Sequence, residues 1–105
     1  MQLDRNLPSN SGRGKYALLK LRMLNRNDPK MISAIEYLEQ AGVLDWGDLG
    51  TDSEFFVIRL KDRYAQEALY GYANEARPAD PEWADEVTEM AKRAGPANQW
   101  CKYPD

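Results

Sequence analysis

The chain has 105 residues, a formal net charge of −3, 43% hydrophobic and 30% charged residues, proportions typical of one soluble domain. No apolar run approaches the roughly 20 residues needed to cross a bilayer. Histidine is absent and Cys101 is the single cysteine, which argues against common forms of acid-base catalysis and zinc binding.

Residues 1–14 mix proline with asparagine, serine and glycine, a composition that predicts an irregular N-terminal arm. The next segment, 15–24, reads KYALLKLRML and is apolar between turn signals, so we expect a strand there. Asp28 and Pro29 then form a helix start, because the carboxylate can cap free amides and proline at the first position loses no hydrogen bond. Apolar spacing predicts a helix over 29–41 that ends before Gly42.

Two further strands are expected after this helix. Residues 43–46 form a short apolar run, and EFFVIRL over 54–60 alternates in the period of two that a strand requires. Asp62 is expected to cap a second helix that ends before Pro78, and Asp80 with Pro81 a third helix over 81–94. The aromatic-rich tail 97–105 is expected to lie on the body of the domain.

This order of elements predicts an α+β fold, a small two- or three-stranded sheet packed with about three helices. The expected organisation is an irregular arm over 1–14 followed by a single domain over 15–105 with a docked C-terminal tail. A lone cysteine cannot form an internal disulfide, and the first residues lack a secretory pattern, so we expect a cytoplasmic protein.

Charge is distributed unevenly along the chain. Residues 1–30 carry a net charge of +5 and residues 31–105 a net charge of −8. Cations near the N-terminus could meet a phosphate-bearing molecule or could simply face solvent. The candidate cations are Arg13, Lys15, Lys20 and Arg22. The stretch from Gly12 to Lys15 is similar to a phosphate-cradling loop but lacks the glycine spacing of a P-loop.

Aromatic side chains in loops, in the tail and off the main helical stripe are candidate contact anchors for a protein or a nucleobase. They could equally cover the edge of a small core. The candidates are Trp46, Tyr64, Tyr70, Trp100 and Tyr103. The acids around residues 45–54 lack the spacing of a calcium-binding loop, so we expect turn chemistry there and neither a metal nor another cofactor.

One arrangement resembles a DNA-binding module. The helix over 29–41, followed by GVLDW and EFFVIRL, is similar to the recognition helix and β-wing of winged-helix proteins. Two features weaken the comparison: Glu36 and Glu39 would repel phosphates, and the preceding helices of such a module are not evident.

The stretch EFFVIRLKDRYAQEALYGYANEARPADPEWADEVTEMAKRAGP, with the terminal CKYPD, resembles small uncharacterised accessory proteins of tailed bacteriophages. The resemblance covers roughly residues 15–105 and contains no catalytic motif. It implies a viral, anti-defence or host-takeover context in which such proteins inhibit host proteins by binding or sequester nucleotide signals. It transfers no functional residue to this chain.

Together these observations predict a non-enzymatic binding protein with no cofactor and no membrane partner. In one mechanism the acidic helix 81–94 or the aromatic tail occupies a host protein. In the other, an oligomer encloses a phosphate-bearing small molecule with residues such as Arg13, Lys15 and Arg22. The alternative is a winged-helix-like regulator that binds nucleic acid. A homo-oligomer is compatible with the sequence, which fixes no stoichiometry.

Overall fold

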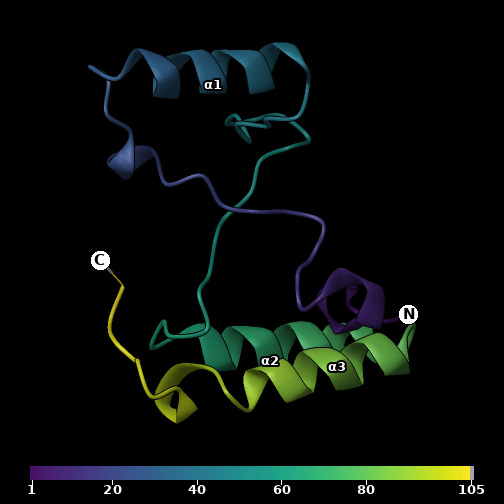
Figure 1. The fold of residues 1–105 in the computed structure, drawn as a ribbon. Helices are drawn as coiled ribbons and strands as arrows, with labels where there is room; N and C mark the ends of the chain where they lie inside the picture. The colour runs from purple at the N-terminus through teal and green to yellow at the C-terminus, as the bar shows by residue number, and fades with distance from the viewer. Residues whose placement is uncertain (105) are drawn as a thin grey trace. The chain divides into compact units, whose positions relative to one another are not determined.

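The computed structural model describes residues 1–104 and contains three α-helices joined by extended segments and short 3-10 helices (Figure 1). The α-helices are α1 (Pro29–Gln40), α2 (Ala65–Ala76) and α3 (Pro81–Ala91), and the 3-10 helices are η1 (Asp4–Asn6), η2 (Pro8–Asn10), η3 (Leu21–Met23) and η4 (Gly95–Ala97). The chain divides into two compact units. The hairpin unit consists of Met1–Ala17 and the chain from Val57 onward, and the inserted unit is Leu18–Phe56.

The predicted α+β fold is wrong, because no strand forms within residues 1–104. The segment expected as a strand over 15–24 ends in η3, and the segments over 43–46 and 54–60 have no strand paired with them. A strand requires a neighbour that satisfies its backbone N–H and C=O groups, and period-two patterning cannot supply one. In the described part of the chain, β-type pairing is limited to a parallel bridge between Asp62 and Lys102.

The expected helices are present, with small shifts at their ends. The helix expected over 29–41 is α1, and the helix expected to end before Pro78 is α2. The helix expected over 81–94 begins at Pro81 but ends at Ala91. Asp80 caps α3 as expected, since its carboxylate accepts a hydrogen bond from the Trp83 amide at 3.1 Å. The expected cap of the second helix by Asp62 is wrong: α2 begins after Tyr64 with no side-chain cap, and Asp62 instead accepts from the Tyr64 amide at 2.8 Å in the turn before the helix.

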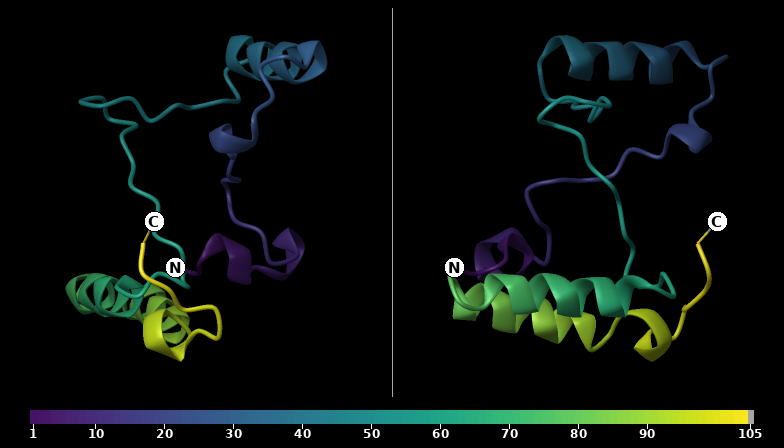
Figure 2. Two further views of the ribbon diagram at one scale, coloured as in Figure 1. Left: turned by 90° about the vertical axis from the view of Figure 1, so that its left-hand side faces the viewer. Right: turned by 180° about the vertical axis from the view of Figure 1, so that it is seen from behind.

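In the hairpin unit, α2 and α3 lie side by side and are joined by a short connection, so they run antiparallel (Figures 1 and 2). The side chains buried between them are small: Ala73 on α2 and Ala84 and Ala91 on α3 are at most 1% exposed. Small residues allow two helix backbones to approach closely. Larger, partly covered side chains surround this contact, namely Leu3, Leu69 and Trp83.

The N-terminal segment is attached to α3. The amino group of Met1 lies 2.9 Å from the Asp80 carboxylate and 3.1 Å from that of Glu82, and the Leu3 amide donates to the Glu86 carboxylate. Leu3 packs against the buried cluster of the helical hairpin. The first residues of the chain therefore cover part of the acidic surface of α3.

Asp80 makes the stability of this attachment dependent on pH. Hydrogen bonds from the Met1 amino group and from the Trp83 amide lower the pKa of Asp80 below its usual 3.8. Stability from this carboxylate is therefore present above the unfolded pKa and is lost as pH falls through the folded one. We expect the Asp80→Asn variant to melt at a lower temperature than the wild type at pH 6. Thermal melts in acid should show that difference shrink as the pH falls below 3.8 and through the lowered pKa of Asp80. A difference that is independent of pH would contradict this assignment.

Gly95 connects the end of α3 to the tail in a conformation that side chains rarely adopt, with φ of +59°. Its amide donates to the Leu60 carbonyl at 2.8 Å. A Cβ atom at this position would lie 3.1 Å from the Gln66 Cβ and 3.2 Å from the Arg63 carbonyl oxygen. The backbone approach at Gly95 therefore holds the chain after α3 against the start of α2.

Replacing Gly95 tests this constraint. We expect Gly95→Ala to lower the free energy of unfolding by about 1–2 kcal/mol, because alanine is strained at positive φ and its methyl group meets the start of α2. Gly71→Ala is the matched control, since Gly71 lies inside α2 with open space around it. That change should stabilise the protein by about 0.5–1 kcal/mol. Urea denaturation measures both values, and equal stabilities for the two variants would refute the argument.

In the inserted unit, both ends of α1 are fixed by local hydrogen bonds. The Asp28 carboxylate accepts from the Lys30 amide at 2.9 Å and from the Met31 amide at 3.4 Å. At the other end Gly42 has φ of +74°, its amide donates to the Glu39 carbonyl, and the Val43 amide donates to the Leu38 carbonyl. This pair of bonds is a Schellman motif. No α-helix within residues 1–104 has the length and apolar character that a membrane span requires.

Candidate protein-binding surface

The C-terminal tail returns to the residues that precede α2 and is held there by backbone hydrogen bonds. The Arg63 amide donates to the Lys102 carbonyl at 2.8 Å, and the Lys102 amide donates to the Lys61 carbonyl at 2.9 Å. Asp105, the last residue of the predicted tail, lies outside the described residues. These two bonds fix the backbone on both sides of Asp62 and close to Tyr103.

Asn98 shapes the turn that leads into this contact. Its side-chain amide donates to the Arg93 carbonyl at 3.1 Å, and its side-chain oxygen accepts from the Trp100 amide at 2.9 Å. The Cys101 amide donates to the Asn98 carbonyl at 3.0 Å. One asparagine therefore links the end of α3 to the tail and sets the direction in which Trp100 leaves the turn.

Three aromatic side chains of this region remain exposed although hydrogen bonds hold their own backbone or that of a neighbouring residue. Tyr64, Trp100 and Tyr103 are 61%, 67% and 65% exposed. The rings of Tyr64 and Tyr103 meet edge to face, with centroids 6.1 Å apart and an angle of 63° between the planes. This is a favourable geometry for two aromatic rings. We call Arg63, Tyr64, Trp100 and Tyr103 the tail aromatic surface.

Arg63 interacts with Tyr103. A hydrogen bond between its guanidinium and Tyr103, followed by the nearby Cys101 thiol, raises the pKa of Arg63 above its usual value. Arginine carries its charge at every physiological pH, so the effect of this contact is to orient the guanidinium. The tail aromatic surface thus combines one positioned cation with three amphipathic rings.

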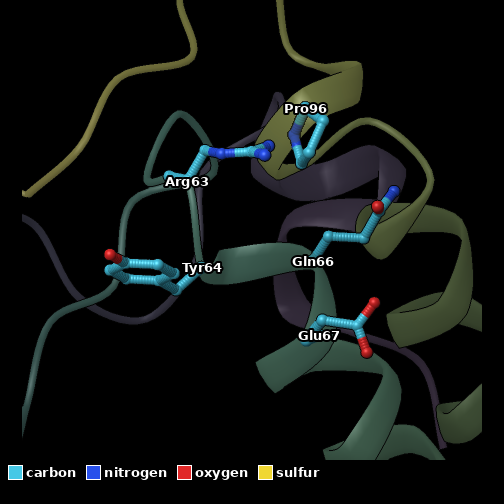
Figure 3. A pocket seen from close by; sticks show the side chains of 5 residues that line it. All are labelled: Arg63, Tyr64, Gln66, Glu67 and Pro96. Carbon is cyan, nitrogen blue, oxygen red and sulfur yellow. The ribbon is translucent and has the colours of Figure 1, made fainter.

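An open depression of about 310 Å³ lies beside this surface. It is lined by Arg63, Tyr64, Gln66, Glu67 and Pro96 (Figure 3). The Arg63 side chain extends toward Pro96, while Gln66 and Glu67 project from the first turn of α2 (Figure 3). Gln66 also donates to the Ala91 carbonyl at 3.1 Å, which ties the rim of the depression to α3. The mixed lining and open form suit a side chain of a partner protein better than an enclosed small molecule.

The predicted cations do not line this depression. Arg13 and Lys15 belong to the hairpin unit, where the Lys15 ammonium lies 3.9 Å from the Asp4 carboxylate and Arg13 is exposed. Lys20 and Arg22 belong to the inserted unit, at the start of η3 and within it. The structure therefore supplies no enclosed site formed by Arg13 and Lys15 within the hairpin unit.

The remaining predicted aromatic residues take other positions. Tyr70 is half-buried on α2, and Trp46 in the inserted unit donates its indole N–H to the Glu39 carboxylate at 2.6 Å. The sequence singled out Tyr64, Trp100 and Tyr103 separately, and the structure brings Tyr64 and Tyr103 into contact. It did not single out Arg63, whose role depends on Tyr103 far along the chain.

The acidic side chains of α3 are engaged within the protein. Beyond the contacts of Glu82 and Glu86 with the N-terminal segment, Asp85 pairs with Arg77 and Glu89 with Lys92. The hydrogen bond from Lys92 to Glu89 raises the pKa of Lys92. Exposed pairs of this kind contribute little stability, but they reduce the negative charge that α3 offers to a partner.

The acids around residues 45–54 take part in turns. Asp45 accepts from the Gly47 amide at 2.9 Å, and Glu54 accepts from the Gly50 amide at 3.0 Å. Across residues 1–104, no group of three or more potential ligand side chains is arranged to hold a metal ion.

No known protein family, no curated protein and no solved structure matches this chain. The similarity to phage accessory proteins therefore stays a prediction from the sequence. The functional argument depends on the chemistry of the tail aromatic surface.

The contribution of Asn98 can be tested without changing that surface. Asn98→Ala removes the acceptor of the Trp100 amide and the donor to Arg93, so we expect faster hydrogen exchange at the amides of Arg63 and Lys102. The free energy of unfolding should fall by about 1 kcal/mol. The exposed neighbour Gln99 gives the control variant Gln99→Ala, which should leave both exchange rates unchanged. Unchanged exchange in Asn98→Ala would show that the tail is held by other contacts.

Proposed function

We propose that this chain is a non-enzymatic binding protein that occupies the surface of a host protein through the tail aromatic surface. The observation that carries the proposal is that Tyr64, Trp100 and Tyr103 are exposed, while hydrogen bonds hold the backbone at Tyr64, at Trp100 and at Lys102 beside Tyr103. In the context that the phage resemblance implies, the protein acts in the cytoplasm of the host cell and interferes with a host or defence process.

The composition of the surface supports binding to protein. Tryptophan, tyrosine and arginine are the residues that most often dominate the binding energy of protein interfaces. Their rings offer a large contact area and have few rotatable bonds, and here the backbone that carries them is already held. Binding therefore has a smaller ordering cost than it would on a loose tail. The depression beside Arg63 offers a place for a side chain of the partner.

Nucleotide sequestration has less support. Lys15 lies beside Asp4, Arg13 is exposed, and neither residue lines the depression of Figure 3. The winged-helix alternative requires a β-wing after the helix, and residues 43–60 contain no strand that could form one. The face of α1 that carries Glu39 is bonded to Trp46 and presents acids to any phosphate.

The test compares the affinity of a host partner for the wild type with its affinity for variants of the tail. The protein is used to capture proteins from a host lysate, and the affinity of the purified partner is then measured by calorimetry. Trp100→Ala and Tyr103→Ala should each weaken binding by about 30-fold, the effect of losing about 2 kcal/mol at a central aromatic contact. Tyr16→Ala is the control, because Tyr16 is 89% exposed in the same unit but outside this surface.

Two results would contradict the proposal. A partner held equally by the wild type and both tail variants would show that another surface binds it. A rise in melting temperature with one member of a nucleotide panel would instead indicate sequestration, because a ligand that binds the folded state stabilises it by mass action.

A further inference from the structure

The inserted unit, Leu18–Phe56, lacks a buried side chain altogether, in contrast to the hairpin unit. Leu24, Ile32, Ile35 and Leu44 are partly covered, but twelve other large apolar residues of the unit are between 37% and 89% exposed. They are Leu18, Leu19, Leu21, Met23, Met31, Tyr37, Leu38, Val43, Trp46, Leu49, Phe55 and Phe56. With side chains of roughly 150–250 Å² each, this leaves on the order of 1,000 Å² of mostly apolar surface uncovered on one unit. Monomeric proteins rarely leave so much apolar surface open to water.

The helix within this unit is nevertheless well defined. Asp28 caps the start of α1 and the Schellman motif at Gly42 ends it. Its apolar residues Met31, Ile35 and Leu38 share one face, because residues three and four apart lie on the same side of a helix. Flanking segments cover that face only in part: the Asn25 amide contacts the Met31 sulfur at 3.4 Å, while Leu38 remains 37% exposed.

A unit of about 40 residues cannot be expected to keep this arrangement on its own. Chains of that size bury too little surface to fold unless a disulfide, a metal or association with another chain supports them. Cys101, the chain's single cysteine, lies outside the unit, and residues 18–56 contain no group of three potential metal ligands. Packing against the rest of this chain or against a second chain must supply that stability.

We propose that a second copy of this chain covers the inserted unit, so that the protein is a homodimer through the apolar face of α1. The α1 face is the centre of this contact, and exposed apolar residues outside α1, such as Leu49 and Phe56, must join it, because a stable obligate dimer buries at least about 1,000 Å² on each partner. A two-fold interface uses the same patch on both copies, and an apolar face is complementary to itself.

The charges of the inserted unit also suit a second copy. Its cations all lie in the first part, at Lys20, Arg22, Arg26 and Lys30. Six of its seven acids lie in the second part, at Glu36, Glu39, Asp45, Asp48, Asp52 and Glu54. Two copies related by a two-fold axis can place the basic part of each opposite the acidic part of the other, which favours association of this chain with itself.

The oligomeric state of the full chain tests the proposal. Light scattering after size exclusion at about 50 μM should give twice the 12.0 kDa of one chain. Ile35→Asp and Leu38→Asp place a charge on the apolar face of α1 and should each shift the protein to monomer, with a dissociation constant raised at least 100-fold. Tyr37→Asp is the matched control, since Tyr37 is 72% exposed and lies about 100° around the helix from Leu38. It should remain dimeric.

Folding and association can be separated in the same samples. Circular dichroism of each variant in the far and near ultraviolet reports whether the helices and the packing around the tryptophans are intact. A folded, monomeric Leu38→Asp protein beside a dimeric Tyr37→Asp protein supports the proposal. A monomeric wild type at 50 μM overturns the proposal. The apolar face of α1 would then be covered by a host protein or by the chain's own hairpin unit. A dimer that survives both apolar-face variants overturns it as well.

Discussion

The close approach of α2 to α3 is the contact on which the hairpin unit depends, and alanine makes it possible. Ala65, Ala73, Ala84 and Ala91 are at most 1% exposed, and no large side chain is fully buried anywhere in the described chain. An interface made of small residues buries little apolar area per residue, so it provides less hydrophobic stabilisation than a core of leucine or phenylalanine. The hairpin therefore needs support from the segments that flank it.

That support comes from the two ends of the described chain. At one end, Leu3 packs on the buried cluster and its amide donates to Glu86. At the other end, Lys102 exchanges backbone bonds with the residues that precede α2. Surface ion pairs such as that of Met1 with Glu82 contribute modestly, whereas backbone bonds and apolar packing persist at high salt. The tail that carries the candidate binding residues is thus part of the structure that stabilises the hairpin.

The sequence predicted those features whose physical cause is local. Asp28 before Pro29 and Asp80 before Pro81 start helices through bonds to amides within three residues, so a short stretch of sequence contains the whole signal. The predicted strands failed because pairing requires a second segment, and the alternation over 54–60 is compatible with an extended chain that forms no strand. The candidate site likewise combines residues that the sequence identifies with contacts that only the fold creates. Tyr103 was recognisable as an exposed aromatic residue, but its contact with Tyr64 and Arg63 depends on the fold of the tail.

The two units present surfaces of different chemistry, and this difference bears on what each surface does. The hairpin unit exposes tyrosine, tryptophan and arginine, which have polar atoms that water can solvate when no partner is bound. Such a surface is compatible with a protein that binds and releases a partner. The inserted unit exposes mainly leucine, methionine, valine and phenylalanine, whose side chains gain nothing from water. Permanent interfaces are the more hydrophobic class, so the proposed dimer contact and the proposed host contact differ in the way their chemistry requires.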